Sequence, residues 1–336
     1  MASALPQYQP YVKPLLVSVG AAIVVYVVWV LATDVRAVSD SAVAVGLGGW
    51  VTILSLSLLN YALRFFRWQA YLRLHSWHIG TRRSLAYYLA SFGFTTTPGK
   101  AGEVVRSFYL KRHGVPYVLS VSALLVERLV DLLAMVVLAA AGALAFPEYR
   151  WFVVLVLGAI LVCVPLVHSA RTHQALEAIC QRLPSDRLRA LGARVVQLLP
   201  TAAILLRPVP LLLGLALGIM SWGAEALAFH VILGQLGVEL GLWVAVGVYS
   251  LGILVGALSF IPGGLGSTEA VMVLLLTLAG TDAPTALAAT LICRLATLWF
   301  AVLIGWFFIA ALRLADGSRG SDGTDGLEEE PTTLEG

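Results

Sequence analysis

The chain has 336 residues, of which 59% are hydrophobic and only 12% carry a charged side chain, and its mean hydropathy is +0.88. This composition excludes an ordinary soluble domain, which needs far more polar surface, and it indicates a polytopic membrane protein. The net charge of +3 is unevenly distributed, because residues 316–336 hold seven acids and one arginine, which leaves about +9 on the rest. A basic excess in a membrane protein faces lipid headgroups, so we expect no nucleic-acid partner.

Long apolar runs recur along the chain, and a run of this length crosses a bilayer as a helix. We therefore predict an all-α protein with six spanning helices, at residues 14–33, 42–63, 115–146, 151–168, 208–236 and 284–312.

Two further apolar stretches, residues 82–112 and 242–281, are broken in the middle by proline and glycine. Such a break leaves backbone groups without hydrogen-bond partners, and hydrocarbon tolerates it only where protein or water surrounds it. The first stretch has basic residues at both ends, so we expect it to enter and leave the membrane on one side. We predict that each stretch forms a re-entrant hairpin.

Residues 169–207 hold six arginines and two amphipathic runs. This pattern predicts helices at the cytoplasmic membrane surface, the second of them with Ser185 as its N-cap. After the second span, the sequence R-F-F-R-W indicates an interfacial belt of aromatic and basic side chains that includes Arg64 and Arg67.

We place residues 1–313 in one membrane domain and residues 314–336 in a disordered acidic tail.

The distribution of lysine and arginine predicts the side of the membrane on which each loop lies. If both termini, both ends of the first hairpin and the 169–207 loop are cytoplasmic, only Arg36 and Arg150 lie on the opposite side. This asymmetry predicts a multi-pass protein of a bacterial cytoplasmic (inner) membrane with both termini in the cytoplasm. It also makes the two hairpins enter from opposite sides.

Residues 95–131 stand out because charged side chains interrupt an apolar stretch. Three helix-breaking residues, Pro98, Gly99 and Gly102, are followed by five charged ones, Glu103, Arg106, Glu127, Arg128 and Asp131. Charge inside a membrane is costly, so such residues face a protein interior or a wet cavity. We interpret this stretch as the functional centre.

The pattern has a second copy. A shift of 164 residues aligns Pro98, Gly99 and Gly102 with Pro262, Gly263 and Gly266, and a shift of 166 residues aligns Glu103 with Glu269 and Arg128 with Arg294. The Glu-to-Arg spacing is 25 residues in both copies. Paired Gly/Pro-interrupted segments are typical of transporters with an inverted-topology repeat, here repeat 1 at about 42–146 and repeat 2 at about 208–312.

The candidate substrate-binding residues are Pro98, Gly99, Gly102, Glu103, Arg106, Glu127, Arg128, Asp131, Pro262, Gly263, Gly264, Gly266, Glu269 and Arg294. Helix N-termini after Gly102 and Gly266 would offer N–H groups to an anion, and the arginines suit a phosphate. The acids, and Glu225 in the fifth span, would pair with arginines or carry protons. The alternative is that these charges form ion pairs that only lock helices together.

The motifs P-G-K-A-G-E-V-V-R, E-R-L-V-D and P-G-G-L-G-S-T-E resemble the flippase-like membrane family that includes the transmembrane region of lysylphosphatidylglycerol synthases. The resemblance covers roughly residues 10–313. It implies lipid translocation between leaflets, and it marks these residues as functional positions: Pro98, Gly102, Glu103, Arg106, Glu127, Arg128, Asp131, Pro262, Gly263, Gly264, Gly266 and Glu269. The chain has no counterpart of the soluble aminoacyltransferase domain of the synthases, so we do not expect synthase activity.

We therefore predict a transporter that moves an anionic phospholipid or a polyprenyl-phosphate-linked lipid through a central polar cavity. Two alternatives stay open, a proton-coupled carrier of a small soluble anion and an enzyme that acts on lipid phosphates. No G-x-S-x-G, H-E-x-x-H or P-loop motif is present, which disfavours the enzyme. We expect a membrane lipid as partner, a homo-oligomer as one option, and no catalytic residue, metal or cofactor.

Overall fold

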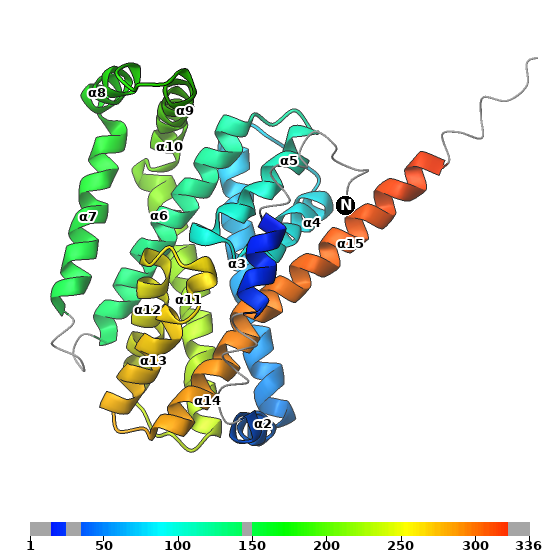
Figure 1. Ribbon diagram of the computed structural model, residues 1–336, viewed down its shortest axis with the longest axis vertical. Helices are drawn as coiled ribbons and strands as arrows, with labels where there is room; N and C mark the ends of the chain where they lie inside the picture. Colours follow the sequence, from blue (N-terminus) through cyan, green and yellow to red (C-terminus); the bar gives the residue numbers. More distant parts are fainter. Residues whose placement is uncertain (1–14, 25–34, 143–149, 322–336) are drawn as a thin grey trace, which may run out of the picture.

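The computed structural model describes residues 15–24, 35–142 and 150–321. All regular structure in these ranges is helical, and the helices form one bundle with shorter, broken segments at its centre (Figure 1). By length and composition, five segments of the described residues can cross a membrane: Gly46–Leu74, Arg150–His168, Asp186–Leu205, Pro208–Gln235 and Ala283–Ala315. The chain is therefore an all-helical, multi-pass membrane protein.

Four of these five segments overlap predicted spans. They are α3 (Gly46–Leu74), α7 (Arg150–His168), α11 (Pro208–Gln235) and the pair α14 (Ala283–Arg294) and α15 (Phe300–Ser321), which one π-helical turn joins. The span predicted at 115–146 is α6 (Tyr117–Gly142), whose 26 residues are enough to cross a bilayer although it carries three charges. The span predicted at 14–33 is described only as the helix Leu15–Val24.

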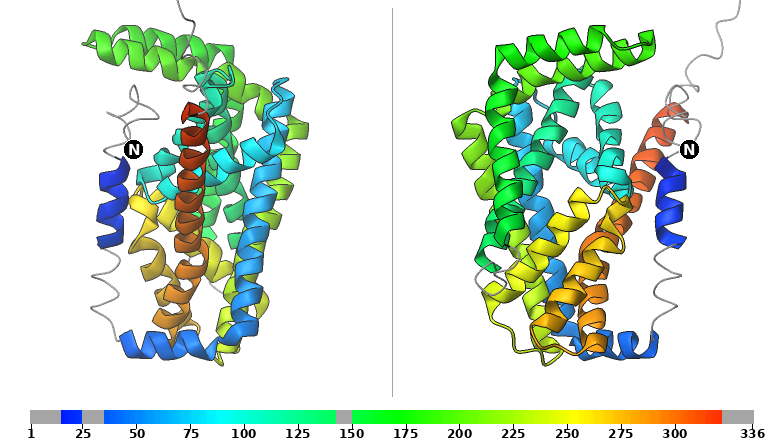
Figure 2. Two further views of the ribbon diagram at one scale, coloured as in Figure 1. Left: turned by 90° about the vertical axis from the view of Figure 1, so that its right-hand side faces the viewer. Right: turned by 60° about the vertical axis from the view of Figure 1, so that its left-hand side comes forward.

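The second span differs from its predicted limits of 42–63. Residues 35–44 form a separate helix, α2 (Val35–Ala44), which lies across one end of the bundle (Figure 2), and α3 continues to Leu74. The helix can continue past residue 63 because Arg64 and Arg67, which would be costly in lipid, lie inside the protein with an acidic partner.

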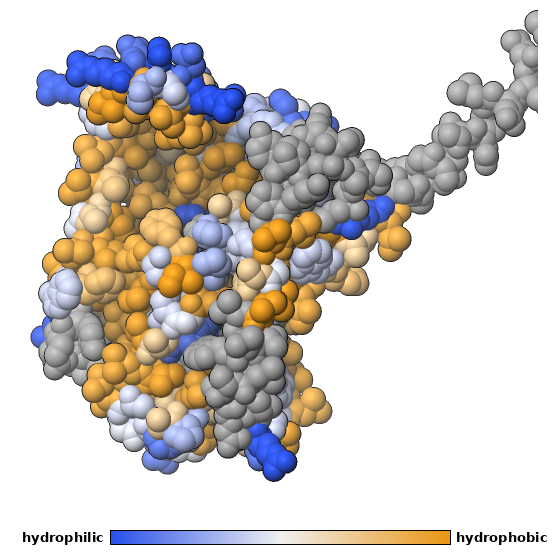
Figure 3. All heavy atoms as spheres, viewed as in Figure 1, coloured by the Kyte–Doolittle hydropathy of each residue, from blue (hydrophilic) through white to orange (hydrophobic). Residues whose placement is uncertain are grey.

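At the other end of the bundle lie α8 (Ala170–Gln181) and α9 (Asp186–Val196), side by side (Figure 2). The predicted N-cap is confirmed, because Ser185 Oγ accepts a hydrogen bond from the Leu188 N–H at 3.2 Å. Hydrophilic residues cover the outer face of this pair and hydrophobic residues its inner face (Figure 3), as the amphipathic pattern predicts. The segment Asp186–Leu205 is not one straight helix, since α9 ends near Gln197 and α10 (Leu198–Leu205) runs toward α11.

Two broken segments occupy the centre of the bundle. The first consists of α4 (Thr81–Ser91), η2 (Phe92–Phe94), η3 (Pro98–Val104) and α5 (Val105–Lys111), and the second of α12 (Leu242–Leu258), η5 (Pro262–Gly264) and α13 (Ser267–Leu278). The outer ends of the first lie toward α8 and α9, and those of the second lie toward α2 (Figure 1). Their tips, η3 and η5, contact each other.

Close helix packing supports these tips. A Cβ atom on Gly142 of α6 would lie 2.3 Å from the Cα atom of Gly247 on α12, so the two backbones approach this closely only because both residues are glycine. Further contacts run between α11 and α3, and between α13 and α14. The largest buried apolar cluster joins α6, α11, α12, α13 and α14. The helices that flank the two tips are thus densely packed against one another.

The last helix is longer than the sequence indicated. Residues 314–321, predicted as the start of a disordered tail, continue α15 to Ser321. Leucine, alanine and arginine in this stretch favour a helix, although it also contains one aspartate and two glycines. The rest of the predicted tail lies outside the described residues.

Candidate functional site

Asp131 on α6 lies among three arginines. Its Oδ1 accepts a hydrogen bond from Arg67 at 2.6 Å, and its Oδ2 lies 3.1 Å from Arg128 and 3.8 Å from Arg64. Arg64 and Arg67, both on α3, are only 5% and 1% exposed. The interfacial belt predicted at R-F-F-R-W is therefore wrong for these two residues, because a carboxylate 64 positions away holds Arg67 inside the protein.

Glu127, four residues before Asp131 on the same helix, pairs with Arg106 of α5. Both side chains are almost completely buried. The Arg106 guanidinium also lies over Trp68, 3.8 Å from the ring centroid, and 5.3 Å from that of Tyr88. A carboxylate and two aromatic faces therefore stabilise this cation. The Arg106–Glu127 ion pair also links α5 to α6.

The first tip, η3, is held by local polar contacts. The Gly102 N–H donates to Thr97 Oγ1 at 2.6 Å, and a Cβ atom on Gly102 would lie 2.5 Å from Phe94 Cβ. Pro98 begins this turn, and Gly99 follows it. The helix N-terminus predicted after Gly102 is thus not a free anion site, since η3 runs directly into the short helix α5.

Glu103 connects the first tip to α6. It accepts a hydrogen bond from Thr95 Oγ1 at 3.1 Å, and it lies 3.6 Å from Arg128. Arg128 therefore lies between two carboxylates, Glu103 and Asp131, and it is 19% exposed.

The second tip repeats this Glu–Arg pairing with a different backbone. Gly263, Gly264 and Gly266 have φ angles of +64°, +66° and +85°, in the region that favours glycine. Arg294 Nε donates to Glu269 at 2.6 Å, and its Nη2 donates to the Gly263 carbonyl at 2.5 Å. The Gly266 N–H donates to Glu269 at 2.7 Å, so a carboxylate of the chain already lies at this predicted helix N-terminal anion site.

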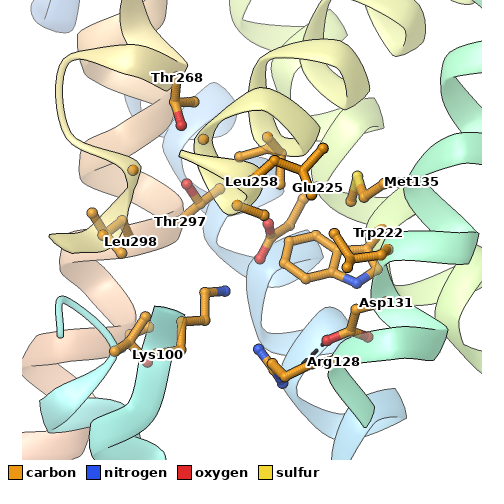
Figure 4. A pocket seen from close by; sticks show the side chains of 18 of the residues that line it. Lys100, Arg128, Asp131, Met135, Trp222, Glu225, Leu258, Thr268, Thr297 and Leu298 are labelled. Carbon is orange, nitrogen blue, oxygen red and sulfur yellow. Dashed lines mark ion pairs between the residues drawn. The ribbon is translucent and has the colours of Figure 1, made fainter. Parts of the chain in front are cut away.

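A cavity of about 350 Å³ extends between the two tips and the helices α3, α6 and α11. Among the described residues, four cations line it, Arg64, Lys100, Arg128 and Arg294, together with two acids, Asp131 and Glu225. The Lys100 side chain points into the space, with its Nζ 5.2 Å from the ring centroid of Trp222 (Figure 4). Its φ of +56° is uncommon for a residue with a side chain, and such backbone strain is frequent at functional sites.

Apolar side chains form the rim of this cavity. In the part of the chain that the structure describes, Leu125, Leu258, Phe260 and Ile261 line it while being 50%, 37%, 71% and 42% exposed. A basic interior therefore adjoins a hydrophobic outer surface.

The structure brings the predicted site residues together around the tips, but only some reach the cavity. Those that line it are Arg128, Asp131, Gly263, Gly264 and Arg294. The others build the tips or pair behind the wall: Pro98, Gly99, Gly102, Glu103, Arg106, Glu127, Pro262, Gly266 and Glu269.

The sequence-based selection missed Arg64, Lys100, Trp222 and Tyr249. A signal existed for Arg64, because its i, i+3 spacing to Arg67 puts both on one helix face. Lys100 stands inside the P-G-K-A-G-E motif, so its position at the tip was also visible. Nothing in the sequence distinguishes Trp222 or Tyr249 from other aromatic residues of apolar helices.

Comparison with known proteins places these elements in a family. A family model of the lysylphosphatidylglycerol synthase transmembrane region matches residues 17–305. The chain is also similar to two UPF0104 membrane proteins of Methanothermobacter thermautotrophicus. One is 23% identical over 274 residues, which cover 74% of this chain and 81% of the relative, and the other is 27% identical over 286 residues, which cover 79% and 84%.

The match includes both tips, the charged helix α6 and every residue that lines the cavity. The resemblance predicted from the motifs is therefore confirmed, and the chain belongs to the family of the lysylphosphatidylglycerol synthase transmembrane region.

Proposed function

We propose that this protein moves an anionic lipid between the two leaflets of the membrane. The lipid is an anionic phospholipid or a polyprenyl-phosphate-linked lipid, whose headgroup passes through the cavity while its chains stay in the bilayer. One observation carries the proposal: the cavity between the two tips is basic inside and has an exposed apolar rim.

The charge of the site supports an anionic substrate. In the ranges that the structure describes, buried and half-buried side chains supply six cations, Arg64, Arg67, Lys100, Arg106, Arg128 and Arg294, and five acids, Glu103, Glu127, Asp131, Glu225 and Glu269. One positive charge is left over even when every acid is ionised, and uncompensated charge in a low-dielectric interior is unfavourable. A phosphate group brings negative charge to these cations and can accept hydrogen bonds from Arg128 and Lys100.

The rim supports a lipid over a small soluble anion. Phe260 and Ile261 are exposed beside the cavity on a surface of membrane-protein composition, so acyl chains can lie against them while the headgroup is inside. A carrier of soluble anions does not need an apolar rim, because its substrate has no apolar part to bind there.

We further propose that six helices span the membrane and that the two broken segments are re-entrant hairpins of an inverted repeat. In support, the equivalent pairs Glu103–Arg128 and Glu269–Arg294 both form, at 3.6 Å and 2.6 Å. The two hairpins also start from opposite ends of the bundle (Figure 1). Opposed hairpins whose tips meet at mid-depth suit a transporter that opens alternately to each side.

The proposal also includes the membrane in which the protein lies and the kind of step it carries out. We place the protein in a bacterial cytoplasmic membrane with both termini in the cytoplasm, on the distribution of lysine and arginine; the relatives compared above come from an archaeon. We assign it transport without covalent chemistry.

A flipping assay tests the proposal. Purified protein is placed in liposomes that contain fluorescent phosphatidylglycerol, and the rate at which the label becomes accessible to an external quencher is measured. We expect faster movement than in protein-free liposomes, at least a tenfold loss in Arg128→Ala, and a smaller loss in Arg128→Lys, because lysine keeps the charge but loses the bidentate fork.

The same assay with fluorescent phosphatidylcholine is the control for leakage and general bilayer disturbance. Equal rates with and without folded protein, for phosphatidylglycerol and for a polyprenyl phosphate, would contradict the proposed function.

A further inference from the structure

Glu225 differs from every other buried acid in the described ranges. Glu103, Glu127, Asp131 and Glu269 each lie within 4.0 Å of an arginine nitrogen. Glu225, on α11, is 4% exposed and lines the cavity, but its described hydrogen bond comes from an uncharged donor, the Tyr249 hydroxyl on α12. Among the buried acids of the described ranges, Glu225 is therefore the one whose ionised form no arginine ion pair stabilises.

Charged and titratable groups surround Glu225, and of these Tyr249 donates the hydrogen bond described above. Those facing it are Tyr61 and Arg64 from α3, Lys100 from the first tip, Tyr249 from α12, and Cys293 and Arg294 from α14. Of these, Arg294 is already paired with Glu269, and Arg64 lies over the rings of Phe92 and Trp222. The Lys100 ammonium and the Glu225 carboxyl group point toward one another across the cavity (Figure 4).

This arrangement couples the charge of Glu225 to the contents of the cavity. Among the described residues, Lys100 is the cavity cation with no carboxylate partner, so before a headgroup binds its ammonium group is a counter-charge across the cavity for an ionised Glu225. A phosphate headgroup that binds Lys100 takes that counter-charge away and brings a second negative charge close to the carboxylate. Two negative groups in one low-dielectric space repel each other strongly, and a proton on one of them removes the repulsion.

We propose that Glu225 takes up a proton when an anionic headgroup enters the cavity and releases it when the headgroup leaves, so that lipid movement is coupled to proton movement. The inference rests on the proposed function. In the step itself, a hydronium ion on the entry side transfers a proton to the Glu225 carboxylate: one O–H bond of hydronium breaks, the O–H bond of the carboxylic acid forms, and a water molecule is left. Tyr249 is a positioning residue, because its hydroxyl donates to the carboxyl group and holds it toward the cavity.

Proton linkage measured with binding tests the coupling. Short-chain phosphatidylglycerol is titrated into detergent-solubilised protein by calorimetry in buffers of different ionisation enthalpy, which gives the number of protons bound per lipid. We expect a maximum of about one proton per lipid in the natural protein and a value near zero in Glu225→Gln. Glu239→Gln, at an exposed acid outside the cavity, is the matched control and keeps the value of the natural protein.

A spectroscopic titration separates this inference from the proposed function. Infrared difference spectra between acid and alkaline pH should contain a protonated-carboxyl band that Glu225→Gln removes and that Tyr249→Phe shifts in frequency, since that band reports the hydrogen bond. Lipid movement without linked protons overturns the inference and leaves the function standing. A titrating Glu225 in a protein that moves no lipid contradicts the proposed function and, with it, the coupling to lipid movement. A spectrum without a Glu225 band overturns the inference directly.

Discussion

Arg106 and Glu127 pair with each other behind the cavity wall, whereas Asp131 is shared by three arginines. Removing Arg128 together with Asp131 would leave Arg64 and Arg67 buried without their carboxylate, so that double change cannot distinguish a structural role from a substrate-binding one. The isolated pair is the better place to measure what an ion pair contributes to the fold alone.

Glu127→Gln should lower the free energy of unfolding by about 3–5 kcal/mol, because it leaves the buried Arg106 guanidinium without a counter-charge. The double change Arg106→Met, Glu127→Leu should recover most of this loss, because both charges disappear together. Melting temperature in detergent measures both effects, and Asp186→Asn, which breaks an exposed pair with Arg189, is the control with little change. A double variant no more stable than Glu127→Gln would show that the pair is not the source of the effect.

At the scale of elements, the two tips depend on glycine for different reasons. Gly264 combines a φ of +66° with crowding, since a Cβ atom there would lie 2.7 Å from Thr268 Oγ1 and 3.1 Å from Gly256 Cα. Gly266 has open space around its Cβ position but a φ of +85°. The second tip is therefore sensitive to volume at one glycine and to backbone conformation at the other.

Gly264→Ala should be less stable than the natural protein by at least the roughly 1–2 kcal/mol that a left-handed backbone costs an L residue, and should slow lipid flipping because it moves the Arg294 partner loop. Gly266→Ala should lower the free energy of unfolding only by the cost of the left-handed backbone, because its added methyl group meets no neighbour. Gly158→Ala on α7 is the matched control, with nothing within 4 Å of its added methyl group, and should not lower the melting temperature. If Gly264→Ala melted and transported like Gly158→Ala, the tip would not need its observed geometry.

The sequence predicted the elements whose signal is local and missed those that depend on distant partners. The Pro-Gly breaks, the second Glu–Arg pair and the Ser185 cap were visible because the residues that cause them are neighbours or repeat at a fixed offset. The extension of α3 was not visible, because its cause is Asp131 on another helix. Glu225 was noticed as an intramembrane acid, but its isolation from arginines is a property of the packed helices.

At the scale of the whole molecule, the two ends of the bundle differ in charge. The end formed by α8 and α9 carries arginines on its outer face, whereas the loop between α11 and α12, at the opposite end, contains Glu239. If the basic end is cytoplasmic, as the distribution of lysine and arginine indicates, the loop after α11 is outside the cell.

Cysteine labelling of intact cells tests this orientation. In a background without Cys163, Cys180 and Cys293, a cysteine at Glu239 should react with a membrane-impermeant maleimide, and one at Arg182 should react only after the cells are opened. Both target positions are exposed, so the side of the membrane on which each lies decides whether the maleimide reaches it. Labelling of Arg182→Cys in intact cells with protection of Glu239→Cys would reverse the topology.

The central claim is that headgroups pass between the two tips, and a reversible lock tests it most directly. Thr96 of the first segment and Gly263 of η5 are adjacent, because a Cβ atom on Gly263 would lie 3.4 Å from Thr96 Cγ2, so cysteine side chains at the two positions would be in contact. In liposomes carrying Thr96→Cys, Gly263→Cys protein without other cysteines, oxidation should stop phosphatidylglycerol flipping and reduction should restore it in the same vesicles. Either single-cysteine variant should be indifferent to the oxidant. Unchanged flipping while the disulfide is shown to be formed would contradict a pathway between the tips.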